Sequence, residues 1–167
     1  MATEEIMLVL GCTLILLVFF VIFSRNYKIF KVDVYVVHIR AGRVRRTSLG
    51  GGIVKLPVID RIILIPATVQ HSILEFDIGE TILKFNFSWR VKDPSLAVKH
   101  VSWSSDDQNY ASRVIDNLSR TMIWNAFVDK DTNTITENQG SLLEQVSSNL
   151  QGLTGNWGIE IESVTGM

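Results

Sequence analysis

The sequence has a single cysteine, Cys12, which lies inside a long hydrophobic run. One cysteine cannot form an internal disulfide, and it cannot build a metal centre from cysteine ligands. The three histidines, His38, His71 and His100, are scattered and match neither H-x-x-x-H nor H-E-x-x-H. Because these spacings bring zinc ligands onto one helix face, their absence predicts that the chain has no metal site.

The sequence also lacks the motifs of nucleotide and hydrolytic chemistry. It contains no G-x-S-x-G nucleophile elbow and no G-x-G-x-x-G dinucleotide loop. Residues 50–52 are glycines followed by Lys55, but Leu56 stands where a phosphate-binding loop needs Ser or Thr. We therefore predict no catalytic residue, no cofactor and no enzymatic activity.

A broad basic surface is missing as well. Residues 24–46 carry seven Lys or Arg against Asp33, whereas residues 47–167 carry nine positive and fourteen negative side chains. An acidic domain is poorly suited to bind the phosphate backbone of a nucleic acid over a wide face. A basic neck beside a hydrophobic segment indicates an anionic membrane surface instead.

The hydrophobic segment covers residues 6–23, of which 16 are apolar. As a helix it would be about 27 Å long, close to the hydrocarbon thickness of a bilayer. A cleavable signal peptide is the rival interpretation, but the start is acidic, the apolar core is long, and the residues after Phe23 form a poor cleavage site. We expect a retained anchor whose membrane-spanning residues include Ile6, Leu10, Leu14, Leu17, Phe20 and Phe23.

The flanking charges predict an orientation. Glu4 and Glu5 precede the segment, and Arg25, Lys28 and Lys31 follow it at the expected membrane interface. Because the side rich in Lys and Arg usually stays in the cytoplasm, the N-terminus should face outward. We thus expect a single-pass protein of the cell membrane, with residues 1–24 as anchor and residues 25–167 as one cytoplasmic domain.

The domain begins with β-structure over residues 32–91. Its strongest strand covers residues 82–91, where apolar and polar side chains alternate. The glycines at 50–52 predict a turn or bulge. A short apolar run admits two interpretations, contact with the bilayer or a buried strand, and its brevity and β-branched residues favour the strand; it comprises Ile62, Ile63, Leu64 and Ile65.

Helical periodicity follows this β-region. Asp93 and Pro94 predict a helix start, and helices are expected over residues 95–101, 108–127 and 136–153. Their apolar stripes are interpreted as core rather than as a groove for a partner. The stripe of the helix over residues 108–127 comprises Tyr110, Val114, Ile115, Leu118 and Met122. A closing strand over residues 159–164 completes an α+β domain, an antiparallel-rich sheet covered by helices.

Four stretches in order resemble the stomatin/prohibitin/flotillin family, also called the SPFH or band 7 domain. They are residues 34–40 (VYVVHIR) before Gly42, residues 50–60 (GGGIVKLPVID), residues 87–94 (FSWRVKDP) and residues 157–164 (WGIEIESV). Two features depart from the family pattern. Gln139 replaces an arginine that members often carry near the start of the last helix. No heptad segment follows to form the usual C-terminal coiled coil.

The resemblance implies a non-enzymatic membrane scaffold with three kinds of partner: the lipid bilayer, further copies of the chain in a homo-oligomer, and a membrane protease or channel. It implies no nucleic-acid partner and no cofactor. The alternative is a membrane-tethered adaptor that regulates a membrane protease or channel without polymerising. A membrane-bound enzyme is a third hypothesis, disfavoured because no nucleophile–base or ligand pattern is found.

Overall fold

The structure is a computed structural model that describes residues 2–56, 58–78, 81–103, 110–128, 130 and 132–166. Its elements, in chain order, are α1 (Ala2–Asn26), β1 (Tyr27–Arg40), β2 (Arg43–Val54), β3 (Asp60–Pro66), β4 (Gln70–Ile78), β5 (Thr81–Val91), α2 (Pro94–His100), α3 (Tyr110–Phe127), α4 (Thr132–Thr154), a 3₁₀ turn (Gly155–Trp157) and β6 (Ile159–Gly166).

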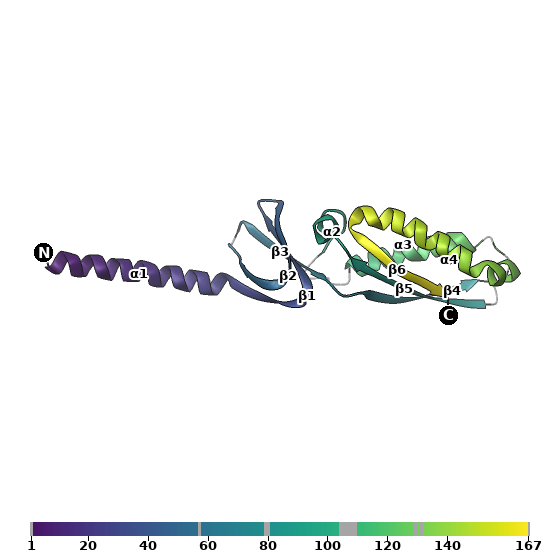
Figure 1. Cartoon of the computed structure of the whole chain (residues 1–167), viewed down its shortest axis with the longest axis horizontal. Helices are drawn as coiled ribbons and strands as arrows, with labels where there is room; N and C mark the ends of the chain where they lie inside the picture. The colour runs from purple at the N-terminus through teal and green to yellow at the C-terminus, as the bar shows by residue number, and fades with distance from the viewer. Residues whose placement is uncertain are drawn as a thin grey trace.

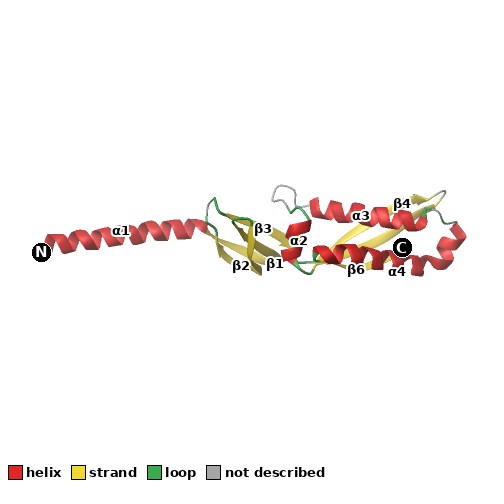
Figure 2. Ribbon diagram, turned by 90° about the horizontal axis from the view of Figure 1, so that it is seen from above, coloured by secondary structure: helices red, strands yellow, loops and turns green. Residues whose placement is uncertain are grey.

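The molecule is elongated, with α1 projecting from one end (Figure 1). Two antiparallel three-stranded sheets follow along the long axis, the first with strand order β2-β1-β3 and the second with order β4-β5-β6. Helices α3 and α4 lie side by side over one face of the second sheet, and α2 lies between the two sheets (Figure 2). The predicted α+β class is confirmed; the β-structure is divided into two sheets, and α3 and α4 cover the second.

The first sheet curls because β1 bends in its middle. Phe30 pairs with Gly51 and Tyr35 pairs with Leu49, so four residues of β1 lie opposite Gly50 alone. Gly50 has a φ of +58°, and a Cβ at this position would lie 2.6 Å from the carbonyl oxygen of Lys31. The predicted glycine-rich turn or bulge is therefore an irregularity inside β2, where glycine lets the bent strand pass close by.

The second sheet shows the predicted alternation along β5. Phe85, Phe87, Trp89 and Val91 are buried under the helices, whereas Lys84 and Arg90 on the opposite face are exposed. Ser88 on that outer face is buried, and its hydroxyl shares a hydrogen bond of 2.7 Å with Ser163 on β6.

The helices begin and pack as their local sequences dictate. The carboxylate of Asp93 accepts hydrogen bonds from the backbone N–H groups of Ser95 and Leu96, which confirms the predicted cap of α2. The predicted apolar stripe of α3 is only partly correct. Ile115 is buried as expected, but Tyr110 is exposed, and the buried face consists of Ala111, Ile115, Ser119, Ile123 and Phe127.

Residues from both sheets contribute to one hydrophobic core. Val37 and Ile65 of the first sheet belong to the same cluster as Phe85 and Trp89 of the second. Each large apolar side chain buried in this way contributes roughly 1.5–3 kcal/mol. A hydrogen bond of 2.9 Å between the hydroxyls of Thr47 and Ser95 adds a polar link between β2 and α2.

Candidate membrane-facing surface

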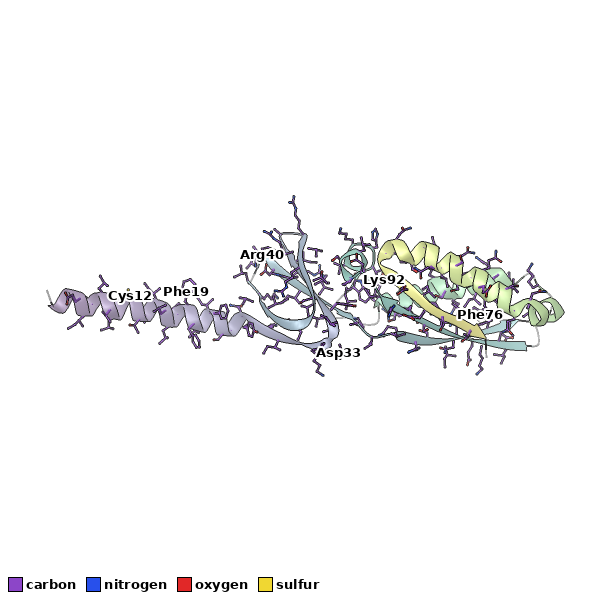
Figure 3. The ribbon with its side chains drawn as sticks, viewed as in Figure 1. Cys12, Phe19, Asp33, Arg40, Phe76 and Lys92 are labelled. Atoms are coloured by element: carbon purple, nitrogen blue, oxygen red, sulfur yellow. The ribbon has the colours of Figure 1, made fainter. Side chains whose placement is uncertain are left out.

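Helix α1 is an apolar helix that the rest of the chain leaves uncovered. Within the described residues, Glu5–Asn26 is the one helix long and apolar enough to cross a membrane, with a mean hydropathy of 3.2 and none of its span buried. The candidate membrane-spanning side chains are all exposed, namely Ile6, Leu10, Leu14, Leu17, Phe20 and Phe23. Figure 3 shows side chains, including Phe19, pointing outward all round this helix.

The helix passes into the first sheet without a linker, since α1 ends at Asn26 and β1 begins at Tyr27. The backbone carbonyl of Asn26 accepts a hydrogen bond of 3.0 Å from the N–H of Lys55, which follows β2. The rings of Phe23 and Tyr27 stack with centroids 6.2 Å apart. Tyrosine is enriched at membrane–water interfaces, so Tyr27 is at a level where a bilayer crossed by α1 would end.

The basic neck surrounds the same junction. Arg25, Lys28 and Lys31 are all exposed at the end of α1 and the start of β1. Arg25 and Lys28 adjoin the stacked Phe23 and Tyr27 along the chain, and Lys31 lies four residues beyond Tyr27. Cations at this level can contact lipid headgroups.

The segment between β2 and β3 presents apolar side chains beside this neck. Leu56 and Ile59 are exposed, and Val58 is completely exposed with a φ of +77°. A positive φ is rare for a β-branched residue, and such outliers concentrate at functional sites. Pro57, which belongs to the second motif, lies outside the described residues.

Asp60 holds both ends of this segment in place. Its side chain is fully shielded, and its two oxygens accept hydrogen bonds from Arg40 Nε (2.7 Å), Arg40 Nη2 (3.0 Å) and the backbone N–H of Leu56 (2.8 Å). His38 Nε2 lies 3.1 Å from Asp60 Oδ2. The hydrogen bonds from Arg40 hold the pKa of Asp60 well below its ordinary value, so the carboxylate is charged.

The sequence does not predict this cluster. Asp60 is the last residue of the second motif, and nothing in the spacing of His38, Arg40 and Asp60 predicts contact. The register of β1 against β3 brings them together, because Arg40 pairs with Asp60 and His38 pairs with Ile62.

The apolar run of β3 is divided between two faces. Ile63 and Ile65 are buried in the core, Ile62 is half-buried, and Leu64 is exposed on the other side of the strand. The burial of Ile63 and Ile65 favours the core interpretation for these two residues. The segment with the exposed apolar side chains lies just before this run, between Leu56 and Ile59.

The histidines stay apart from one another. His71 and His100 are exposed on β4 and at the end of α2, whereas His38 is buried in β1. Across the described part of the chain, no group of three or more His, Cys, Asp or Glu side chains is arranged to hold a metal ion.

Comparison with known families gives a match over most of the chain. The family model described as SPFH domain / Band 7 family matches residues 28–165, a range that includes all four motifs of the sequence resemblance. A comparison with curated proteins found no match.

Proposed function

Because the chain belongs to the SPFH domain / Band 7 family, we propose that it is a single-pass membrane scaffold that self-associates and organises lipids or partner membrane proteins. Members of this family commonly associate with membranes and oligomerise, and they are generally scaffolds or regulators rather than enzymes. The domain would be residues 25–167, carried by an anchor of residues 1–24.

The observation that carries the proposal is the uncovered apolar surface of α1. The domain shields none of the Glu5–Asn26 span. Burying one Leu, Ile or Phe side chain away from water contributes roughly 1.5–3 kcal/mol, so a helix with this many exposed apolar residues strongly favours a bilayer over water. The span of 22 residues is about 33 Å long, sufficient to cross the hydrocarbon core.

Charge supports an orientation with the N-terminus outside and the domain in the cytoplasm. Residues 24–66 contain nine Lys or Arg and two Asp, whereas residues 67–167 contain seven Lys or Arg and thirteen Asp or Glu. The basic half lies next to α1 (Figure 1). An anionic inner leaflet would attract this half and repel the acidic far half, so the far half would point away from the membrane.

The exposed segment Leu56, Val58 and Ile59 would contact the bilayer in this orientation. It follows Lys55, whose N–H is bonded to the carbonyl of Asn26 at the end of the anchor. Apolar side chains at this level can enter the headgroup region, while Arg25, Lys28 and Lys31 contact the phosphates around them.

The test combines topology with self-association in cells that express the full chain with a tag at each end. Protease added to intact cells should remove the N-terminal tag and leave the domain intact, and alkaline carbonate should not release the chain. Amine crosslinking should then produce a ladder of multiples of the chain mass. A domain digested from outside would refute the orientation, and a purely monomeric chain that co-purifies with one partner would favour the adaptor alternative.

The variant Leu14→Arg tests whether α1 itself holds the chain in the membrane. A charge at the centre of a membrane helix costs about 3 kcal/mol, so this variant should be partly released by carbonate and should give a weaker ladder. An unchanged membrane fraction in this variant would argue that α1 does not span the bilayer.

A further inference from the structure

In the hairpin of β1 and β2, strand β2 carries three arginines whose positions are set by strand register. Arg43 pairs with Arg40, and Arg46 pairs with His38, so these side chains share the face of the first sheet that lies away from Val37 and Ile39. Arg45 is the extra residue at the register shift between His38 and Ile39. All three arginines of β2 are exposed.

The nearby carboxylate cannot neutralise them. Both oxygens of Asp60 already accept hydrogen bonds from Arg40, and one of them also accepts from the N–H of Leu56. Among the described residues, Arg43, Arg45 and Arg46 form no ion pair. Three guanidinium groups within four residues therefore remain available to an anion from outside the chain.

The hairpin lies on the anchor side of the sheet. The N–H of Ala41, at its turn, donates a hydrogen bond of 3.2 Å to the carbonyl of Ile59, and the segment that leads to Ile59 starts at Lys55, bonded to Asn26. Figure 3 shows Arg40 nearer to α1 than Asp33, which marks the bend of β1 on the far side. The turn and the end of the anchor are thus joined through one short segment.

We propose that Arg43, Arg45 and Arg46 bind the phosphate groups of anionic lipids, a contact separate from that of the cations at the end of α1 and the start of β1 and dependent on the proposed membrane anchoring. Guanidinium groups form paired hydrogen bonds with phosphate oxygens, which favours them over ammonium groups for this task. The bilayer surface is the source of phosphate that the anchor holds permanently at this level. The hairpin would therefore enrich anionic lipid around the protein.

The test uses the full chain in phosphatidylcholine vesicles with a trace of spin-labelled lipid. The fraction of label immobilised by the protein is compared for phosphatidic acid and for phosphatidylcholine. The wild type should prefer phosphatidic acid, and Arg43→Gln with Arg46→Gln should reduce this preference by about fivefold for each arginine, because a near-surface cation contributes about 1 kcal/mol. The control removes two exposed cations of the far half, Lys99→Gln with Lys130→Gln, and should keep the preference.

Four results would overturn the inference. The hairpin variant could keep the wild-type preference, or the control could lose as much as the hairpin variant. Soluble glycerol phosphate at matched ionic strength could abolish the preference, which would assign the hairpin to a free phosphate compound. If even phosphatidylcholine is not immobilised, α1 is not in the bilayer and the proposed function fails together with the inference. Immobilised phosphatidylcholine with a hairpin-independent preference overturns the inference alone.

Discussion

Replacement of Gly50 by alanine tests the bend that curls the first sheet. Gly50 has a φ of +58°, which costs an alanine about 1 kcal/mol or more. The added Cβ would also lie 2.6 Å from the carbonyl oxygen of Lys31 and 2.9 Å from the Cα of Val32. Both contacts are to backbone, which cannot rotate away, so overpacking adds roughly 1–3 kcal/mol. Gly50→Ala should therefore lower the free energy of unfolding by about 2–4 kcal/mol.

The neighbouring glycine separates the two causes. Gly51 has a φ of +93° but no atom within 4 Å of an added Cβ, so Gly51→Ala should lose only the conformational part, about 1–2 kcal/mol. Gly140→Ala, in the open interior of α4, should gain roughly 0.5–1 kcal/mol. Denaturant titrations in detergent, followed by tryptophan fluorescence, measure all three. Equal losses for Gly50→Ala and Gly51→Ala would refute the close passage of β1 over Gly50.

Two further predictions concern charge and strand edges. Because Arg40 depresses the pKa of Asp60, the stability from this carboxylate is complete above the ordinary carboxyl pKa of about 3.9 and is lost as the pH falls below it. Asp60→Asn should destabilise the chain at neutral pH and flatten its acid-unfolding profile; an unchanged profile would show that the cluster contributes nothing. The guanidinium of Arg120 donates to the carbonyl oxygen of Glu75 on the edge strand β4, at 2.9 Å. Arg120→Ala should expose this edge, cost roughly 0.5–1.5 kcal/mol and increase aggregation in light scattering, whereas Lys130→Ala, with the same charge change, should not.

Local patterns in the sequence predicted those parts of the fold that depend on neighbouring residues. The alternation in β5 and the cap at Asp93 involve contacts of short range, and both are confirmed. The family resemblance, carried by four short motifs, is confirmed by the match over residues 28–165. These signals depend on spacing along the chain, which a single sequence displays directly.

The buried face of α3 was predicted less well because small residues contribute to it. Ala111 and Ser119 are buried, and the hydroxyl of Ser119 donates a hydrogen bond of 2.8 Å to the carbonyl oxygen of Ile115. A hydrophobic pattern gives such positions little weight and favours Tyr110, which is exposed. Tertiary packing decides which side of an amphipathic helix is covered.

The Asp60 cluster could not be predicted because it depends on long-range register. Arg40 and Asp60 are twenty residues apart and meet only when β1 and β3 pair antiparallel. The early part of β1 was missed for another reason. Its residues Tyr27, Lys28 and Ile29 are exposed, so they lack the alternation that marks a half-buried strand.

Because α1 passes directly into β1, a tilt of the proposed anchor would be transmitted to the first sheet. A span of about 33 Å slightly exceeds the usual hydrocarbon thickness, and such helices tilt when the bilayer becomes thinner. With no linker after Asn26, and with Lys55 bonded to its carbonyl, the first sheet must rotate with the helix. A local change in bilayer thickness would thus change the orientation of the distal helices α3 and α4 relative to the membrane.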